Sequence, residues 1–201
     1  MPLQSLQRAR RLYLRPVFKS TMHRRNGGDI TMQEVAEFQK VSFTQFLKDS
    51  QKTGFIDSET SPELIKLIWE KIKLPVRATA KSAGYDFFLP FSFSVYANGA
   101  LTIPTGIKAN IDDGWYLMLV PRSSLGFKHG LRLLNTCGII DADFTDGDTE
   151  GHILAKITVD RNMCLQEGDR FIQGILVQHG ITKDDNPTCL TRSGGFGSTG
   201  K

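Results

Sequence analysis

The chain has 201 residues, 40% of them hydrophobic and 23% charged, which is typical of one globular domain with appendages. No apolar stretch is long enough to cross a bilayer, so we expect no membrane partner. The formal net charge of +4 arises in residues 1–28, which hold seven basic residues and no acidic one. The rest of the chain has 18 of the 25 Lys and Arg residues against all 21 Asp and Glu residues, so we expect no nucleic-acid partner either.

The N-terminal segment, residues 1–28, also places Leu6, Ala9, Tyr13 and Val17 at helical spacing. A mitochondrial transit peptide has these features, and a disordered basic tail fits them equally well. The three cysteines of the chain are odd in number and widely spaced, which favours a reducing compartment and argues against a disulfide scaffold or a structural zinc site. We therefore expect a cytoplasmic protein, or a mitochondrial one if the segment is a transit peptide.

Two local patterns compete between residues 29 and 60. Thr31 and Glu34 form a capping box that predicts the start of a helix. The following Val41–Phe46 alternates between apolar and polar residues as a strand does, so the boundary between helix and strand stays open.

A stronger helix start follows at Ser61, with Pro62 at the first helical position. This predicts a helix over 62–73 that packs on the core, and a partner-binding helix is the alternative. One apolar face is expected to carry Leu64, Ile65, Ile68, Trp69 and Ile72.

From Leu74 onward, short runs of β-branched and aromatic residues recur between turn signals such as Asn98-Gly99 and Asp112-Asp113-Gly114. Many short strands at this spacing predict a β-sandwich or barrel. The strands expected are Tyr85–Leu89, Ser92–Tyr96, Ala100–Ile103, Gly106–Ala109, Tyr116–Val120, His152–Val159 and Phe171–Gln178.

The last ten residues, Arg192–Lys201, contain four glycines, three hydroxyl side chains and the isolated aromatic ring of Phe196. Glycine lets the backbone approach a ligand closely, and an arginine supplies a fork of donors to a phosphate. The segment predicts a nucleotide-triphosphate clamp on a flexible arm, with a disordered tail as the alternative. Gly195 to Lys201 fits P-loop spacing, but no Ser or Thr and no helix follows it in this sequence, so we do not expect a P-loop.

Five short segments together carry the functional signal of the chain. In chain order they are Ala83–Phe87 (AGYDF), Pro121–Leu125 (PRSSL), Asn135–Phe144 (NTCGIIDADF), Gly168–Gln173 (GDRFIQ) and Arg192–Gly200 (RSGGFGSTG). The ordered set resembles the five motifs of the trimeric dUTP nucleotidohydrolases, the dUTPases, and it covers about residues 74–201.

The resemblance implies an all-β fold, a jelly-roll-like β-sandwich or barrel, with a flexible C-terminal arm. The expected N-terminal helical extension lies outside the residues that carry the resemblance. It also implies a homotrimer with shared active sites that hydrolyses dUTP to dUMP and pyrophosphate with Mg²⁺. Such an activity limits uracil entry into DNA and supplies dUMP for thymidylate synthesis. The parts expected are a basic tail at 1–28, an extension with a helix at 29–73, a dUTPase-like core at 74–180 and an arm at 181–201 that closes the site.

In the family pattern, Asp141 is the general base that orients a water for attack on the α-phosphorus, a step that depends mainly on positioning and charge stabilisation. Asp86 matches the carboxylate that holds magnesium through water, and we expect the metal to arrive mainly with the substrate. Taken by itself, each aspartate also fits an ordinary turn residue.

The segment around Asn135 resembles the uracil-reading hairpin of the family, whose backbone groups bind the edge of the base and leave cytosine unpaired. Its implied substrate-binding residues are Asn135, Gly138, Ile139 and Ile140. Phe144 stands where the family usually has tyrosine, and its ring face is expected to pack on deoxyribose and exclude a 2′-hydroxyl. An ordinary core aromatic is the alternative for Phe144.

The remaining matched positions concern the triphosphate. The arginine and serines of the second motif offer charge-assisted hydrogen bonds to the α- and β-phosphates, or else form a polar turn after a strand. The residues implied are Arg122, Ser123, Ser124 and Gln173, and in the arm Arg192, Phe196, Gly197, Ser198 and Thr199.

Three features depart from the family pattern. Arg192 lies four residues before Phe196, where five is the commoner spacing. An acidic loop, 145–150, replaces a shorter turn. We interpret it as a solvated loop, with a second cation site as the alternative. The third departure is the N-terminal extension.

Two other functions compete with a dUTPase. A dCTP deaminase shares the Arg-Ser motif, but it needs a catalytic glutamate where this chain has Lys156, and a lysine cannot replace that carboxylate. A non-catalytic nucleotide binder on the same fold is the other alternative, and the complete set of five motifs argues against it.

Overall fold

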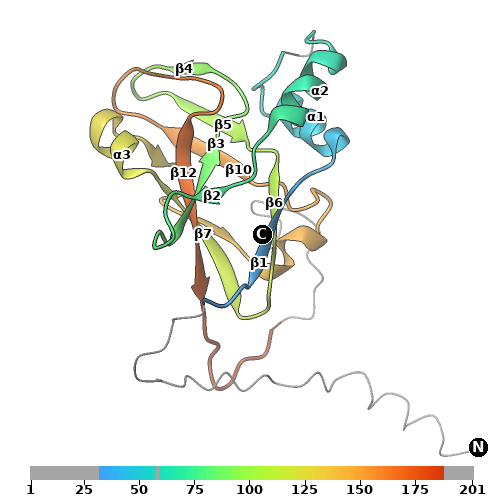
Figure 1. The fold of residues 1–201 in the computed structure, drawn as a ribbon, viewed down its shortest axis with the longest axis vertical. Helices are drawn as coiled ribbons and strands as arrows, with labels where there is room; N and C mark the ends of the chain where they lie inside the picture. The colour runs from blue at the N-terminus through green and yellow to red at the C-terminus, as the bar shows by residue number, and fades with distance from the viewer. Residues whose placement is uncertain (1–31, 58, 188–201) are drawn as a thin grey trace, which may run out of the picture. The chain divides into compact units, whose positions relative to one another are not determined.

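The computed structural model describes residues 32–57 and 59–187. Glu34 and the described residues after it belong to one compact unit (Figure 1). Its helices are α1 (Phe43–Lys52), α2 (Pro62–Lys71), α3 (Ser123–His129) and the short 3-10 helix η1 (Ala142–Asp146). Its strands are β1 (Ala36–Lys40), β2 (Val76–Arg77), β3 (Gly84–Phe88), β4 (Phe93–Val95), β5 (Ala100–Pro104), β6 (Ile107–Ile111), β7 (Trp115–Pro121), β8 (Arg132–Leu133), β9 (Gly138–Ile140), β10 (Leu154–Thr158), β11 (Met163–Leu165) and β12 (Arg170–Gln178).

The largest sheet has five strands in the order β2-β3-β12-β7-β9, with antiparallel pairing throughout. A second sheet has the order β5-β10-β8, and β1–β6 and β11–β4 form two separate pairs. The long strand β12 lies in the middle of the first sheet and pairs with β3 on one side and β7 on the other. The all-β prediction with N-terminal helices is thus confirmed.

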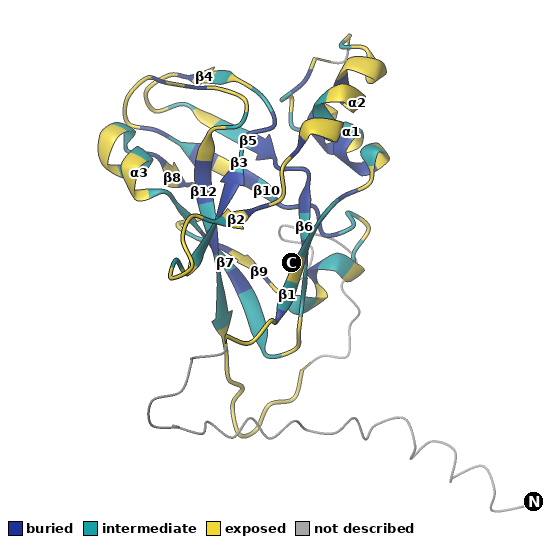
Figure 2. Ribbon diagram, in the orientation of Figure 1, coloured by how far each residue is buried: buried dark blue, intermediate teal, exposed yellow. Residues whose placement is uncertain are grey.

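The core lies between the strands of these sheets, and Figure 2 shows stretches of buried residues in dark blue along strands such as β3 and β5. Strand alternation turns Phe87, Leu117 and Phe171 inward from the large sheet and Ile103 and Ile157 inward from the second sheet, all at most 1% exposed. Each of the seven strands expected from the sequence is present, with ends that differ by at most two residues. The strands that were not expected are short ones and β1.

The N-terminal extension differs from the sequence prediction. Residues 32–35 form no helix, and the next residues form strand β1, which pairs antiparallel with β6 from Ala36 opposite Ile111. The strand-like run from Val41 instead enters helix α1. Ser42 caps this helix, because its side chain accepts a hydrogen bond from the backbone N–H of Gln45. Pairing with a strand some 70 residues later therefore overrides the capping box at Thr31.

Helix α2 follows the prediction closely. Ser61 accepts a hydrogen bond from the N–H of Leu64 and Pro62 opens the helix, which ends at Lys71, two residues before the expected end. Ile65 is buried, as expected, whereas Leu64 is 51% exposed and does not belong to the core-facing side. The indole N–H of Trp69 donates to the carbonyl of Val41 at 2.9 Å and ties α2 to the start of α1.

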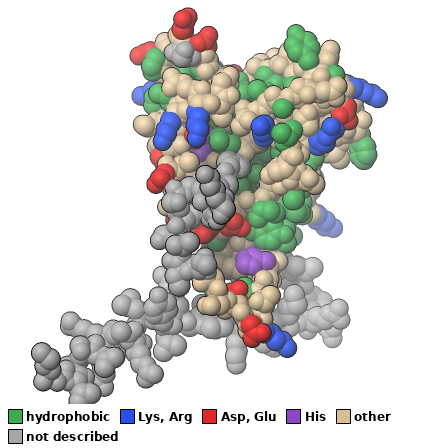
Figure 3. Space-filling model, turned by 180° about the vertical axis from the view of Figure 1, so that it is seen from behind, with side chains coloured by type: hydrophobic (Ala, Val, Ile, Leu, Met, Phe, Trp, Pro, Cys, Tyr) green, Lys and Arg blue, Asp and Glu red, His purple; other side chains and the backbone are tan. Residues whose placement is uncertain are grey.

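The surface carries charges of both signs. On the face that Figure 3 shows, basic and acidic side chains are interspersed with hydrophobic ones. No helix among the described residues is long and apolar enough to span a membrane. Within the described part of the chain, Cys137 and Cys164 are free thiols.

Candidate active site

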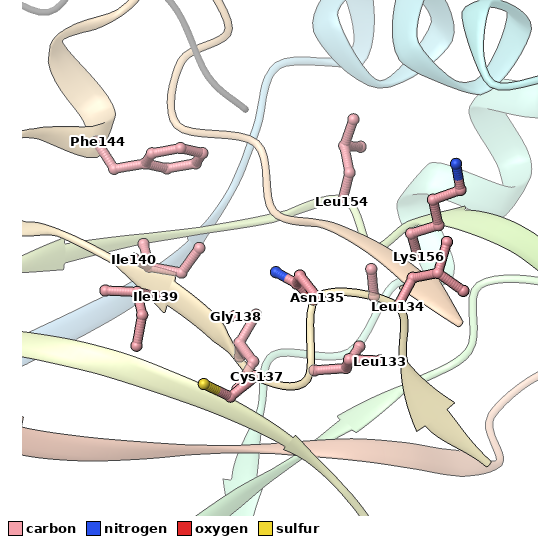
Figure 4. A pocket seen from close by; sticks show the side chains of 12 residues that line it. Leu133, Leu134, Asn135, Cys137, Gly138, Ile139, Ile140, Phe144, Leu154 and Lys156 are labelled. Atoms are coloured by element: carbon pink, nitrogen blue, oxygen red, sulfur yellow. The ribbon is translucent and has the colours of Figure 1, made fainter. Parts of the chain in front are cut away.

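A cavity of about 550 Å³ lies beside β9 and is walled by β7, β10 and η1. All five residues expected to read uracil and deoxyribose line it, so the fold brings this part of the predicted site together. Figure 4 shows Phe144 on one side of the cavity and Asn135 on the other, with Ile140 and Gly138 between them. The complete lining is Leu119, Leu133, Leu134, Asn135, Cys137, Gly138, Ile139, Ile140, Phe144, Leu154, Ala155 and Lys156.

A tight turn positions Asn135 at the edge of this cavity. The turn is closed by a bridge between Leu133 and Thr136, with a backbone hydrogen bond of 3.0 Å from the N–H of Thr136 to the carbonyl of Leu133. Thr136 has a φ of 69°, which is uncommon for a residue with a branched side chain. The expected hairpin is therefore confined to this turn, and β9 continues from it by pairing with β7.

Strand β9 lies close to β7 because residue 138 has no side chain. Gly138 pairs with Leu119, and a Cβ atom added at 138 would lie 3.1 Å from the Leu119 side chain. A larger residue would push β9 away from β7. The next residues alternate, with Ile139 exposed and Ile140 buried.

Asp141 follows directly after β9 and occupies the N-cap position of η1. It is exposed, with extended backbone angles, and its carbonyl accepts a hydrogen bond from the N–H of Phe144 at 3.1 Å. This turn directs the ring of Phe144, 3% exposed, into the cavity wall. The predicted catalytic residue is thus one residue beyond Ile140 in the chain and is not itself among the residues that line the cavity.

Apart from the cavity, a cluster of charged side chains lies where β3, β7 and β12 run side by side. It consists of Asp86, Arg122 and Arg170 and is called the positive cluster below. The carboxylate of Asp86, on β3, bonds two guanidinium groups: Nε of Arg122 at 2.9 Å from Oδ1 and a terminal nitrogen of Arg170 at 3.0 Å from Oδ2. Asp86 is only 6% exposed, whereas the side chains of Arg122 and Arg170 are 26% and 43% exposed. The three side chains sum to one positive charge, so the cluster favours an anion at its exposed side.

Gln173 lies next to this cluster on β12, opposite Asp86 on β3 and Val120 on β7. Its amide occupies the space that a side chain at Gly84 would fill, so a larger residue at 84 would displace the amide of Gln173. Ser123 and Ser124 follow Arg122 as the first two residues of α3 and are exposed. The segment after Arg122 therefore forms helix α3 and not the simple polar turn that the sequence also allowed.

Comparison with known proteins identifies the family. A family model described as dUTPase matches residues 70–200. A deoxyuridine 5′-triphosphate nucleotidohydrolase from Lactococcus lactis subsp. lactis is 37% identical over 133 residues, which is 64% of this chain and 89% of the relative. The chain belongs to the dUTPase family.

Other dUTPases agree with this assignment. The corresponding protein of Arabidopsis thaliana is 34% identical over 149 residues, covering 72% of this chain and 87% of the relative. The crystal structure of a dUTPase from Streptococcus mutans has a TM-score of 0.50 and 36% sequence identity, over 55% of this chain and 88% of that one. The expected fold class and family are thereby confirmed.

The structure separates the dUTPase motifs of one chain into two groups. The third motif contributes to the cavity, whereas Asp86 and Arg122 belong to the positive cluster and Gln173 lies next to it, and none of these three lines the cavity. The roles of these residues stay predictions. The predicted residues of the fifth motif lie outside the described residues: Arg192, Phe196, Gly197, Ser198 and Thr199.

Arg170 is the main residue that the sequence analysis missed. It lies within the GDRFIQ motif, three residues before Gln173, but the motif alone gave it no role. Its partner, Asp86, is 84 residues away in the chain, so only strand pairing reveals the contact. Leu154 and Lys156 were also missed as cavity residues, because the sequence predicts only that they lie on a strand.

The described residues do not offer a site of their own for magnesium. They contain no group of three or more His, Cys, Asp or Glu side chains placed to hold a metal ion. Asp86, the expected metal contact, has each oxygen in an ion pair with an arginine, and the surrounding charge is positive. Such a cluster suits phosphate oxygens better than a cation. A water-mediated contact from Asp86 to magnesium stays a prediction.

Proposed function

We propose that this protein hydrolyses dUTP to dUMP and pyrophosphate, and so limits uracil entry into DNA and supplies dUMP for thymidylate synthesis. The observation that carries the proposal is the cavity beside Asp141, which is lined by every residue expected to read uracil and deoxyribose. Membership of the dUTPase family supports the same substrate.

The base and the sugar are selected by different walls of the cavity. The turn at Asn135 and the start of β9 present backbone donors and acceptors to the edge of uracil. The amino group of cytosine would leave those buried groups unpaired, which is strongly unfavourable. On the other side, the ring of Phe144 packs against deoxyribose and leaves no room for a 2′-hydroxyl. Because the ring face does this, phenylalanine serves in place of tyrosine.

The positive cluster binds the phosphates. Arg122 and Arg170 are oriented by Asp86 and direct their remaining N–H groups to phosphate oxygens, while Ser123 and Ser124 donate hydroxyl hydrogen bonds. Asp141 orients a water and accepts its proton as the water oxygen attacks the α-phosphorus in line. The bond to the bridging oxygen then breaks, and pyrophosphate leaves.

Magnesium belongs to the substrate in this proposal. Bound to the triphosphate, it neutralises part of the negative charge and keeps several of its own waters. The protein contributes the positive cluster, which includes the carboxylate of Asp86, and no resident metal is part of the proposal.

We further propose a homotrimer whose sites are shared between subunits. The support is the separation described above: in one chain, the cavity residues and the phosphate-binding cluster do not line the same space. A second copy of the chain would supply the missing half of each site. The arm predicted at residues 181–201 would close the filled site as a lid and exclude water.

Pyrophosphate release from dUTP, dTTP, dCTP, dATP, dGTP and UTP tests the proposal. Only dUTP should be turned over efficiently, and the reaction should require magnesium. Ammonia should be measured in the dCTP reaction. Release of ammonia would identify a deaminase, and binding of dUTP without turnover would identify a nucleotide binder; either result contradicts the proposed function.

A further inference from the structure

Two parts of the chain that depart from the family pattern are bonded to each other. Ser42 lies in the N-terminal extension, outside the residues matched by the family model, and Glu150 ends the acidic loop. The N–H of Ser42 donates to Oε2 of Glu150 at 2.9 Å, and its hydroxyl donates to Oε1 at 2.6 Å. One carboxylate therefore binds both donors of the residue that caps helix α1.

The backbone at the end of the loop is held in an unfavourable conformation. Glu150 has a φ of 53°, in the left-handed region, and Gly151 follows with a φ of 72°. A residue other than glycine is strained in this region and persists only where the surroundings hold it. The two bonds from Ser42 fix the side chain of this strained residue.

A second contact joins His152, the residue after Gly151, to helix α1. His152, 1% exposed, bonds Asp49 of α1 through Nδ1 at 2.7 Å, and its Nε2 accepts the N–H of Gly106 at 2.8 Å. Because Nε2 is an acceptor, Nδ1 carries the proton and donates it to the carboxylate. Gln45 also donates to Asp49, at 2.7 Å. Helix α1 thus binds the loop end at its N-terminus and again about two turns further on.

The loop end in turn supports the sugar side of the cavity. A Cβ atom added at Gly151 would lie 2.8 to 3.2 Å from atoms of Thr145 and from the carbonyl of Phe144, so the chain at 151 rests against the residues that carry this ring. Leu154, three residues later, lines the cavity as well. Moving residues 150–152 would therefore move two walls of the cavity.

We propose that helix α1 is a positioning element for the deoxyribose side of the active site, acting through the Ser42–Glu150 and Asp49–His152 contacts on Phe144. This inference rests on the proposed function. Neither Ser42 nor Asp49 touches the substrate; they fix the loop end, and the loop end fixes the ring that excludes a 2′-hydroxyl. The extension and the acidic loop are two halves of one structural unit.

The test compares Ser42→Ala and Glu150→Gln with Ser61→Ala. Ser61 caps α2 as Ser42 caps α1, but its side chain accepts from Leu64 and has no contact with the loop. In the first two variants the ratio of kcat/KM for dUTP to that for UTP should fall about tenfold, the scale of a modest misplacement of a contacting group. Ser61→Ala should keep the wild-type ratio, and Ser42→Thr, which retains a hydroxyl, should keep most of it.

Hydrogen–deuterium exchange provides a readout that does not depend on turnover. Peptides covering 142–152 should exchange faster in Ser42→Ala and Glu150→Gln than in the wild type and in Ser61→Ala. If the wild-type protein hydrolyses dUTP, unchanged selectivity and unchanged exchange in both Ser42→Ala and Glu150→Gln would overturn the inference. A wild-type protein that does not hydrolyse dUTP would instead overturn the proposed function, and the selectivity role with it.

Discussion

In the proposed mechanism, Asp141 is the residue on which the chemistry depends most directly. Asp141→Asn keeps the shape of the side chain but removes the proton acceptor, so turnover of dUTP should fall about 10²- to 10⁴-fold, the usual contribution of a general base. Binding of a non-hydrolysable dUTP analogue, measured by calorimetry, should persist.

The matched control is Asp146→Asn, an exposed carboxylate at the end of the same 3-10 helix. It should retain nearly wild-type turnover. If Asp141→Asn also did, the general base would have to be sought elsewhere.

The buried carboxylate of Asp86 orients two more exposed arginines. Its substitution is therefore expected to affect both substrate binding and stability. In Asp86→Asn the guanidinium groups lose their charged partner, so KM for dUTP should rise about tenfold, while stability falls by about 2 kcal/mol, typical of hydrogen bonds to charged groups. Steady-state kinetics and urea unfolding measure the two effects.

Asp160→Asn is the control for an ion pair that is not buried. Asp160 contacts Arg132 at 2.6 Å, but both side chains are 54% exposed, so its loss should cost less than about 1 kcal/mol and leave KM unchanged. Equal effects of the two substitutions would show that burial of Asp86 is irrelevant.

Among the structural elements, α2 is joined to the extension by polar contacts at its C-terminal end. Lys40 donates to the carbonyls of Trp69 and Glu70 at 3.1 and 2.8 Å, and the indole of Trp69 donates to the carbonyl of Val41. The cation therefore binds two carbonyls in the last turn of the helix, where the dipole also favours positive charge.

Trp69→Phe keeps a ring but leaves the buried carbonyl of Val41 without this donor. Stability should fall by about 1–3 kcal/mol, as for an unsatisfied buried acceptor. Leu67→Ala, on the exposed side of the same helix, should change it by less than about 0.5 kcal/mol. Urea unfolding followed by circular dichroism gives both values, and a larger loss for Leu67→Ala would mean that α2 packs by its other face.

At the scale of the whole molecule, two carboxylates make stability depend on pH. Burial by itself raises the pKa of Asp49, but hydrogen bonds from His152 and Gln45 outweigh it and hold the pKa below its ordinary value of 3.8. Burial likewise acts to raise the pKa of Glu150, and the two bonds from Ser42 hold it below 4.5. Both groups therefore favour the folded state above these pH values and lose that effect as pH falls.

Thermal unfolding between pH 7 and pH 3 measures this dependence. The wild-type Tm should drop on the acid side of about pH 4.5, the ordinary range of carboxyl groups, and Asp49→Asn should show a lower but flatter curve. Parallel curves would show that Asp49 does not contribute to the acid transition.

If sites are shared between subunits, the protein should have the mass of a trimer. Two inactive variants should also recover activity when they assemble together. Light scattering should give about three times the 22.4 kDa of one chain. When Asp141→Asn and Arg122→Ala chains are unfolded together and refolded, mixed trimers should contain some sites with both groups intact and regain activity. An active monomer, or mixtures no more active than the separate variants, would contradict shared sites.

Much of the molecule was predictable from local patterns. Alternation over β3, β5, β7, β10 and β12 reflects which side chains face the core, and it can be read strand by strand. The same holds for α2, whose cap and proline are adjacent in the chain. The cavity residues were expected from the dUTPase resemblance and not from a local pattern; the five that it implied all lie within the ten residues from Asn135 to Phe144.

Only the tertiary structure decided the contacts between distant segments. Strand β1 exists because β6 offers its edge, Arg170 meets Asp86 across two paired strands, and Ser42 reaches Glu150 over 108 residues of chain. Local sequence fixes which faces are apolar and which ends are capped. It does not fix which strands become neighbours, because that depends on the free energy of burying all of these faces at once.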